Sequence, residues 1–538
     1  MTVDPLFERD GRKGWSVQRF EEQTMNTHTD AAAGLAQIGM RRVVVIPFLS
    51  WLLLSWTGVA DVRAETAADR PNFVLMMCDD LGWGDTGFNG NRVIRTPSLD
   101  AMAKSGMVFR RFYAASAVCS PTRGSVLTGR HPYRYGVTTA NTGHLRSGEL
   151  TLAELLRELG YATGHFGKWH LGTMSRTVVE SNRGGPRGAK NFAPPWINGF
   201  QVCFSTEAKL PTYDPMWKPR QGAGKRGWDF IADRAQAELY GTHYWNQDAQ
   251  QVTDNLDGDD SRVIMDRVVP FVQRAAQQKQ PFLAVVWFHT PHLPVVAGPR
   301  HAGMYAEHDS YPRNYFGCVT AMDEQVGRLR RVLRDLGVSE NTLLAFCSDN
   351  GPEGKASAPG SAGRFRGRKR DLYEGGIRVP AVVEWPRRVA AGSATDYPAV
   401  TSDFLPTILD ILQWKLPARR PIDGVSLVPV LAQEQRQRPV PIGFEFAGKL
   451  ALSDNRYKIV SYPPAGTARS KKKQAPQNAI QSRTFELYDL LEDPGESRNI
   501  AEHHPQLVRD MVLRLSAWRK SCQVSAGGAD YPHSDSQP

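Results

Sequence analysis

The chain has 538 residues, of which 41% are hydrophobic and 22% charged, with 13 Trp and 22 Phe. This length allows roughly two to four domains, or one large α/β domain with an appendage, and the composition excludes global disorder, a coiled coil and a multi-span membrane protein. The 66 basic and 55 acidic residues give a formal charge of +11, which is compatible with nucleic acid, a polyanion or an anionic small substrate and selects none of them. Six cysteines are too few for a disulfide-stapled scaffold.

The amino-terminal segment predicts export. Residues 43–60 are 18 residues without a charge, they follow Arg41 and Arg42, and small residues end the stretch. This order is typical of a secretory signal, and a single membrane anchor is the alternative because such a length nearly spans a bilayer. Pro47 and two possible cleavage sites favour removal. We therefore predict that residues 1–64 are a non-mature extension with a signal peptide, and that the mature form is periplasmic or extracellular without a stable membrane span.

Alternating strand and helix patterns predict the fold class. Residues 72–78 form a continuous apolar run that ends in Asp79-Asp80, and residues 282–288 and 343–347 repeat the pattern. Helical spacing occurs over 99–109 and 152–159. Such alternation predicts a large, mainly parallel sheet between helices, with polar side chains gathered at the carboxyl ends of its strands.

Changes in composition predict the domain organisation. Residues 65–435 are expected to form the main domain, and 174–262, rich in Gly, Pro, Trp and Tyr, an ordered insertion beside the sheet. From about residue 440, two alternating stretches and a helical one predict a small C-terminal α+β subdomain with an antiparallel sheet over 436–538, ending in a disordered tail. The stretches are 456–460, 485–490 and 507–518. The Lys471–Lys473 triplet between them is expected in a solvated loop.

The most specific stretch of the sequence runs from Ala117 to Arg130. Pro121 is expected at the first position of a helix, which would place Cys119 just before the positive helix end. An anion held there would meet backbone N–H groups, the helix dipole and the guanidinium of Arg123. The alternative is an inert buried cysteine, since most cysteines serve only packing.

Four further motifs supply charged and polar side chains. Lys168 and His170 are two apart in a predicted strand and would share one face. Asp349 and Asn350 follow the strand 343–347, and with Asp79 and Asp80 they offer the oxygen ligands that a hard divalent cation requires. Adjacent acids on a strand point to opposite faces unless the chain turns, and Asp-Asn-Gly is often only a turn. The remaining candidates are His292, with His289 as its competitor, and Lys369, flanked by Arg368 and Arg370.

Taken together, these motifs resemble the type I sulfatases, of the arylsulfatase-like, exported bacterial type. The resemblance rests on Cys-x-Pro-x-Arg followed by Leu-Thr-Gly over 119–129 and on the motifs at 160–172, 288–294, 348–351 and 367–378, and it covers about 70–520. Phe166 is bulkier than the residue common in the family. The resemblance implies an alkaline-phosphatase-like α/β fold, one calcium ion, and hydrolysis of sulfate monoesters by a formylglycine made from Cys119 after translation.

The resemblance also implies the role of each residue. The calcium ligands would be Asp79, Asp80, Asp349, Asn350 and the modified Cys119. The sulfate contacts would be Arg123, Lys168, His292 and Lys369. His170 would hydrogen-bond the second hydroxyl of hydrated formylglycine. The implied partners are a formylglycine-generating enzyme that acts on the Cys119 motif and a sulfated small molecule or polysaccharide, with no nucleic acid.

Other interpretations remain open from the sequence. A phosphonate monoester or phosphodiester hydrolase can use the same residues, and a catalytically inactive carbohydrate-binding member would require that Cys119 is never converted. A zinc phosphatase is less well supported, because its extra histidine ligands are not evident. Aromatic and polar side chains in 203–216 and 243–246 suit a sugar or simply pack on the sheet. Cys78 and Cys347, inside predicted strands, are expected to be free and buried.

Overall fold

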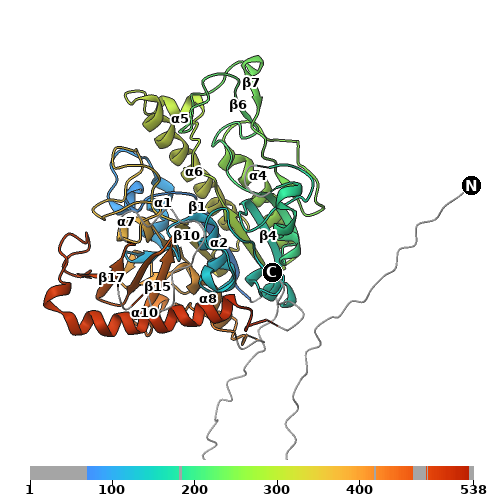
Figure 1. Ribbon diagram of the computed structural model, residues 1–538. Coiled ribbons are helices and arrows are strands. Elements are labelled where there is room, and N and C mark those ends of the chain that lie inside the picture. Colours follow the sequence, from blue (N-terminus) through green and yellow to red (C-terminus); the bar gives the residue numbers. More distant parts are fainter. Residues whose placement is uncertain (1–69, 181–183, 417–419, 464–479, 481–482, 532–538) are drawn as a thin grey trace, which may run out of the picture. The chain divides into compact units, whose positions relative to one another are not determined.

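A large mixed β-sheet organises the computed structural model, which describes residues 70–180, 184–416, 420–463, 480 and 483–531 (Figure 1). Among these residues, nine strands form the sheet in the order β13-β2-β12-β10-β1-β9-β4-β5-β8. The five strands from β10 to β5 run parallel, whereas β12 and β8 are antiparallel to their neighbours. The predicted fold class is therefore confirmed. The strands are β1 (Asn72–Cys78), β2 (Met107–Phe109), β4 (Ala162–Lys168), β5 (Val202–Thr206), β8 (Trp245–Asn246), β9 (Phe282–Trp287), β10 (Thr342–Ser348), β12 (Val382–Glu384) and β13 (Ser393–Thr395).

Helices cover both faces of this sheet because its central strands are apolar on both sides. Along β1, Phe73, Leu75 and Met77 enter one core, while the alternate residues Val74, Met76 and Cys78 enter the other. The first core receives α2 (Cys119–Thr128), α3 (Leu152–Glu158) and α8 (Phe404–Ile411). The second receives α1 (Pro97–Ser105), α4 (Asp260–Gln277) and α6 (Ser310–Asp335).

A separate antiparallel sheet forms near the C-terminus, as predicted. Its order in the described residues is β15-β16-β17-β18, and one face packs on the long helix α10 (Figure 1). The other face packs on Tyr113, Leu372 and Ile377 of the main body. These elements are β15 (Ile442–Phe446), β16 (Lys449–Ser453), β17 (Tyr457–Ser461), β18 (Glu486–Asp489) and α10 (Pro505–Ala526). The minor elements are β3 (Phe112–Tyr113), β6 (Trp217–Pro219), β7 (Ala237–Leu239), β11 (Arg378–Val379), β14 (Ala399–Val400), α5 (Pro299–Gly303), α7 (Glu374–Ile377) and α9 (Val428–Leu431).

Two expectations about local structure are wrong. The helix predicted over 99–109 ends at Ser105, and 107–109 is strand β2. Gly106 separates them because a Cβ there would lie 2.3 Å from the Val383 carbonyl oxygen. The segment 174–262 does not lie wholly beside the sheet, since it contributes β5 and β8 to it. Pairing with β4, rather than any periodicity of its own, makes Val202–Thr206 a strand.

Several expectations fall outside the described residues: the signal at 43–60, the Lys471–Lys473 loop and the tail after residue 531. The division into 65–435 and 436–538 remains a prediction. Within the described part, no helix is long and apolar enough to cross a membrane. All six cysteines belong to this part and none is in a disulfide, so Cys78 and Cys347 are free and buried as expected.

Candidate active site

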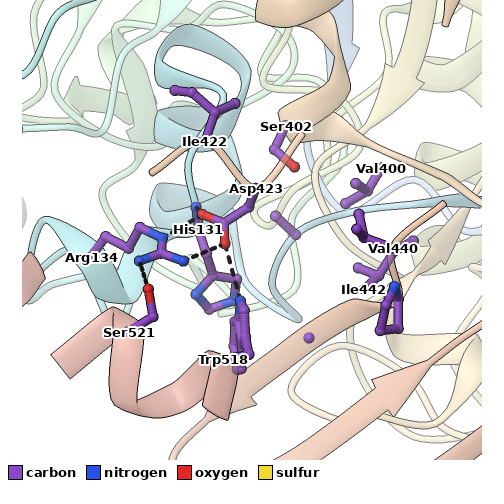
Figure 2. Close-up of a pocket in the computed structure, with 13 residues that line it drawn as sticks. His131, Arg134, Val400, Ser402, Ile422, Asp423, Val440, Ile442, Trp518 and Ser521 are labelled. Atoms are coloured by element: carbon purple, nitrogen blue, oxygen red, sulfur yellow. Dashed lines mark hydrogen bonds and ion pairs between the residues drawn. The ribbon is translucent and has the colours of Figure 1, made fainter. Parts of the chain in front are cut away.

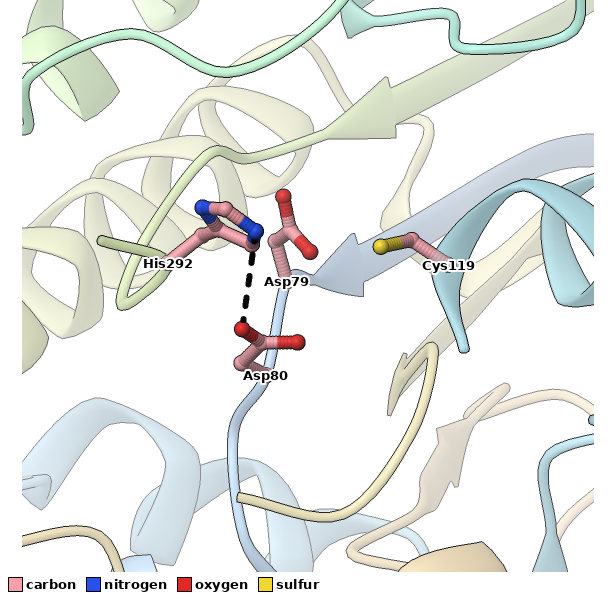
Figure 3. A group of neighbouring side chains, drawn as sticks. All are labelled: Asp79, Asp80, Cys119 and His292. Carbon is pink, nitrogen blue, oxygen red and sulfur yellow. Dashed lines mark ion pairs between the residues drawn. The ribbon is translucent and has the colours of Figure 1, made fainter. Parts of the chain in front are cut away.

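Side chains from separate strand ends and one helix meet at the carboxyl edge of the main sheet. Asp79 and Asp80 follow β1, Cys119 begins α2, and His292 lies on the loop after β9. Figure 3 shows these four side chains pointing toward one another. Their nearest ligand atoms all lie within 4.8 Å of one another, and the first three residues are buried. The structure thus brings together residues that are up to 213 positions apart (292 − 79) in the sequence.

A turn in the backbone lets both aspartates face the same site. Asp80 has a φ of 69°, in the left-handed region, directly after the last residues of the strand. Its N–H donates to Asp349 Oδ1 at 3.1 Å, and its Oδ1 accepts from Asn350 Nδ2 at 2.7 Å. The Asp-Asn pair after β10 is therefore joined to the Asp-Asp pair after β1.

Three buried cations surround these carboxylates. Lys168 Nζ donates to Asp79 Oδ2 at 2.5 Å, and Lys369 Nζ lies 2.7 Å from Asp80 Oδ1. Arg123 Nη2 donates to Asp349 Oδ2 at 2.6 Å. Lys369 is thus the residue of its motif that reaches the carboxylates, whereas Arg368 donates to backbone carbonyls and Arg370 to Glu353.

The oxygen atoms of the cluster fit a hard cation. Asp79 Oδ1 and Asn350 Oδ1 are buried and have no hydrogen-bond partner among the described residues. Oxygen ligands of this kind are the ones that calcium prefers. His292 belongs to the group of side chains whose ligand atoms lie within 4.8 Å of one another, and Asp349 and Asn350 adjoin this group through their hydrogen bonds with Asp80. The cation position is therefore supported by the residues present, with His292 as a neighbour that the predicted ligand set did not contain.

Burial and charge set the protonation of the cluster. Burial alone would raise the pKa of Asp79, but Lys168, His292 and Arg123 outweigh it and hold that pKa well below its usual range. Burial, together with the negative charge of Asp79, raises the pKa of Asp349 to about 7. Burial also raises the pKa of the Cys119 thiol to about 11. The unmodified Cys119 is therefore a neutral thiol at ordinary pH and a weak nucleophile.

Two details of the predicted motifs are corrected. Helix α2 begins at Cys119 and not at Pro121. A proline fits anywhere in the first turn, where no N–H is needed for an intrahelical bond, so it does not define the first residue. His170 lies beyond the end of β4 with a φ of 59°, so it does not share a strand face with Lys168. It is buried, and its carbonyl accepts from Ser120 Oγ at 2.6 Å, which ties it to the start of α2.

The two candidate histidines differ in their surroundings. His289 is completely buried, with Nε2 at 2.7 Å from Thr206 Oγ1 and Nδ1 at 2.8 Å from Asp260 Oδ2. Both of its ring nitrogens are thus used within the fold. His292 is partly exposed, and its Nε2 lies 3.7 Å from Asp80 Oδ2. The geometry favours His292 as the site residue and His289 as a structural one.

Some aromatic residues of the 174–262 segment serve packing, including those of the 203–216 and 243–246 stretches that are buried. Phe204 and Tyr244 stack with ring centroids 3.9 Å apart, and Trp245 is also buried. These side chains favour the packing interpretation over sugar binding. Tyr213, by contrast, is only partly buried.

Two residues near the site, Lys209 and Glu353, were missed from the sequence, and Arg370 was named there only as a neighbour of Lys369. Lys209 follows β5 at the same edge, and burial together with the charges of Lys168 and Lys369 lowers its pKa. Glu353 and Arg370 form an ion pair beside Lys369. Glu353 comes four residues after Asp349, and Arg370 directly follows Lys369, but nothing in the sequence indicates that they pair.

A cavity of about 270 Å³ lies elsewhere, between α10 and the body of the protein (Figure 2). Its polar groups largely satisfy one another, since Asp423 binds Arg134 at 2.6 Å and Trp518 Nε1 at 3.1 Å. None of the predicted site residues lines this cavity in the described part of the chain.

Known proteins are similar to this chain in both sequence and fold. The family model "Sulfatase" matches residues 71–414, and the model "N-sulphoglucosamine sulphohydrolase, C-terminal" matches 362–521. N-acetylgalactosamine-6-sulfatase of Mus musculus is 32% identical over 76% of this chain and 74% of that protein. Arylsulfatase A of Homo sapiens is 33% identical over 84% of this chain and 86% of that protein.

Solved structures agree on the fold. The structure of Ps i-CgsB in complex with k-i-k-neocarrahexaose has a TM-score of 0.68 and 24% identity, and the match covers 87% of this chain and 96% of that chain. The family model spans more than half of the chain and contains the site residues from Asp79 to Lys369. The chain belongs to the sulfatase family of sulfuric ester hydrolases.

Proposed function

We propose that the protein hydrolyses sulfate monoesters to an alcohol and inorganic sulfate, with a formylglycine made from Cys119 and one calcium ion. The observation that carries this proposal is the position of Cys119. Its side chain is buried at the first residue of α2, within 4.8 Å of ligand atoms of Asp79, Asp80 and His292. A thiol with a raised pKa is poorly suited to attack by itself, and its conversion to formylglycine explains why a cysteine stands there.

The buried cations would bind and orient the sulfate. Arg123, Lys168 and Lys369 lie around the carboxylates with nitrogen–oxygen distances of 2.5–2.7 Å. Fixed donors in a water-poor site stabilise charge that develops on the sulfuryl oxygens without having to reorganise. His292, on the more exposed side of the cluster, would contact the sulfate next to Lys369.

Calcium and formylglycine would supply the remaining chemistry. Asp79, Asp80, Asp349, Asn350 and the modified residue 119 would hold calcium, which acts as a Lewis acid on a sulfate oxygen. Formylglycine, when hydrated, supplies a hydroxyl nucleophile in place of the thiol.

The surrounding residues would handle the protons. The Asp349 carboxylate would accept the proton of the attacking hydroxyl. His292 Nε2 or Lys369 Nζ would protonate the departing alcohol oxygen. His170 would hydrogen-bond the second hydroxyl. Arg123 and Lys168 would serve as fixed charges that bind the sulfate oxygens.

For the substrate we propose a sulfated carbohydrate. The support comes from relatives: one is named for sulfated N-acetylgalactosamine and one solved structure holds a neocarrahexaose. We further propose that a formylglycine-generating enzyme converts Cys119 and that the protein is exported, as the pattern of residues 43–60 predicts.

Mass spectrometry of the peptide that contains residue 119 tests the proposal directly. Conversion to formylglycine is expected in protein made beside a generating enzyme, with loss of turnover in Cys119→Ala and retention of the fold. Sulfated sugars, nitrophenyl sulfate, a phosphodiester and a phosphonate monoester should be compared at equal concentration. A higher kcat/KM for either phosphorus ester than for every sulfate ester would contradict the reaction. If no sugar exceeds the aryl sulfate, only the carbohydrate assignment is wrong.

A further inference from the structure

Arg370 is held in a backbone conformation that favours glycine. Its φ is 77°, where a side chain is strained. Two contacts fix the residue there: its N–H donates to the Ala117 carbonyl at 2.9 Å, and its own carbonyl accepts from Lys449 Nζ at 2.6 Å. These two backbone contacts hold the loop around Arg370 in place.

Glu353 orients this side chain and is itself saturated. Its Oε1 accepts from Arg370 Nη1 at 2.7 Å and from the Gly354 N–H at 2.9 Å. Its Oε2 accepts from Arg370 Nη2 at 2.8 Å and lies 3.4 Å from Lys369 Nζ. A carboxylate with both oxygens used in this way has little capacity left for a ligand. Glu353 therefore acts through Arg370.

The guanidinium of Arg370 retains free donors. Its fork uses one N–H of each terminal nitrogen, which leaves the outer N–H groups and Nε–H without a hydrogen-bond acceptor among the described residues. The side chain is 55% exposed. A guanidinium in this state binds an acceptor, and it binds carboxylate or sulfate oxygens best because they match its planar fork.

Arg370 also stands at the edge of the catalytic cluster. The adjacent Lys369 reaches Asp80 with its ammonium at 2.7 Å, and the same ammonium touches Glu353. A continuous chain of charges thus runs from the buried carboxylates to the exposed guanidinium. Its backbone bond to Ala117 places Arg370 beside the segment that enters α2 at Cys119.

We propose that Arg370 is a specificity-determining residue, which binds a second acidic group, sulfate or carboxylate, on the alcohol part of the substrate, with Glu353 as its positioning residue. This inference rests on the proposed function and narrows its substrate class to saccharides that carry an anion besides the sulfate that is removed. The scissile sulfate has its own buried cations, so Arg370 is free for another group.

The backbone conformation provides a clean variant. Arg370→Gly removes the guanidinium and relieves the strained φ, so the loop should keep its shape. Arg370→Lys keeps the positive charge but lacks the planar guanidinium. Glu353→Gln weakens the ion pair that orients the Arg370 side chain. Lys279→Gly is the matched control, because Lys279 is an exposed cation with a φ of 50° at the end of α4, away from the site.

The test compares three matched disaccharides that share one scissile sulfate: one with a hexuronate carboxylate, its carboxyl-reduced form, and the reduced form with a second sulfate. Arg370→Gly should lower kcat/KM about 10- to 100-fold for substrates whose second anion it binds, the loss expected for a hydrogen bond to a charged group. The neutral substrate should change less than about threefold, below the effect of one such bond. For the acidic substrates, kcat/KM of Arg370→Lys and of Glu353→Gln should lie between the values of the wild type and Arg370→Gly. Lys279→Gly should have the kcat/KM of the wild type. The acidic substrate whose kcat/KM falls more in Arg370→Gly shows whether Arg370 binds the carboxylate or the second sulfate.

Binding to Cys119→Ala protein separates this inference from the proposed function. Calorimetry should show that the acidic disaccharides bind more tightly than the reduced one, and that adding Arg370→Gly removes the difference. An absence of turnover in the wild type would refute the proposed function and leave this binding comparison intact. Equal losses on all substrates, or an unchanged preference for acidic ones, would overturn the role of Arg370.

Discussion

Replacing Lys458 by methionine should destabilise the protein by about 3–5 kcal/mol, the cost of breaking a buried ion pair from one side. Lys458 is completely buried in β17, and its Nζ lies 2.9 Å from Glu374 Oε1 and 2.9 Å from Glu496 Oε1. Glu374 would keep Arg378 and the Tyr113 hydroxyl as partners. Glu496 would lose its only ion pair among the described residues, and its buried carboxylate would keep the Glu374 N–H as a hydrogen-bond donor but no cation.

Lys218 provides a matched control for this prediction. It pairs with Glu238 at 3.0 Å, nearly the same distance, but the two side chains are 35% and 43% exposed. An exposed pair contributes about 0–1 kcal/mol, so Lys218→Met should have little effect. The two variants differ mainly in burial, and urea denaturation followed by Trp fluorescence measures both. If Lys458→Met costs no more than Lys218→Met, the reasoning from burial is refuted.

The pH dependence of the stability gives a second check of the Lys458 prediction. Burial raises the pKa of Glu496 to about 7 from an ordinary value of 4.5, although Lys458 opposes this and Glu374 adds to it. Between these two values the folded state binds more protons than the unfolded state, so this group stabilises the fold increasingly as pH falls through about 7. Without Lys458 the proton should bind more readily. The deficit of Lys458→Met should therefore be smaller at about pH 5.5 than at about pH 8, and Glu496→Gln in the same protein should remove most of that pH dependence.

Two further predictions concern the candidate site. Chelation should abolish sulfatase activity, and calcium should restore it better than magnesium, which demands a stricter coordination geometry. Asp80→Asn should prevent this restoration of activity. Metal analysis that finds stoichiometric zinc would contradict the calcium site. His289→Ala should lower the free energy of unfolding by about 1–3 kcal/mol because it leaves buried partners unsatisfied. His292→Ala should leave stability nearly unchanged and lower kcat/KM about 100-fold or more, and the reverse pattern in denaturation and kinetic assays would exchange the two roles.

The sequence predicted the central sheet well because its strands are buried on both faces. Residues 72–78 form an unbroken apolar run, and β1 has these same bounds. Parallel strands deliver their carboxyl ends to one edge, so the polar residues after β1 and β10 could be expected to meet. The motifs around Cys119, Lys168 and Lys369 were informative for the same reason, since each lies at this edge or faces it.

The remaining features depend on contacts that no local pattern encodes. His289 and His292 both follow β9, and only the position of Thr206 and Asp260 shows which ring is fully used. Strand β5 is a strand because β4 lies beside it. Glu353 and Arg370 are 17 positions apart, and their pairing follows from the path of the intervening loop.

Left-handed backbone angles are a further feature of the site. Three residues other than glycine at or beside the site adopt left-handed φ angles: Asp80 at 69°, His170 at 59° and Arg370 at 77°. Each costs about 1–2 kcal/mol relative to an ordinary conformation. At Asp80 the cost is offset by contacts from Asp349, Asn350 and Lys369, which exist only because the chain turns there. A glycine would adopt these angles at lower cost, but Ala249 and Ala447 also have left-handed φ angles, so the strain by itself assigns no role and the contacts of each side chain do. For Asp80 the side-chain contact is the carboxylate cluster. For Arg370 it is Glu353, and the second anion that we propose for the substrate would use the donors that Glu353 leaves free.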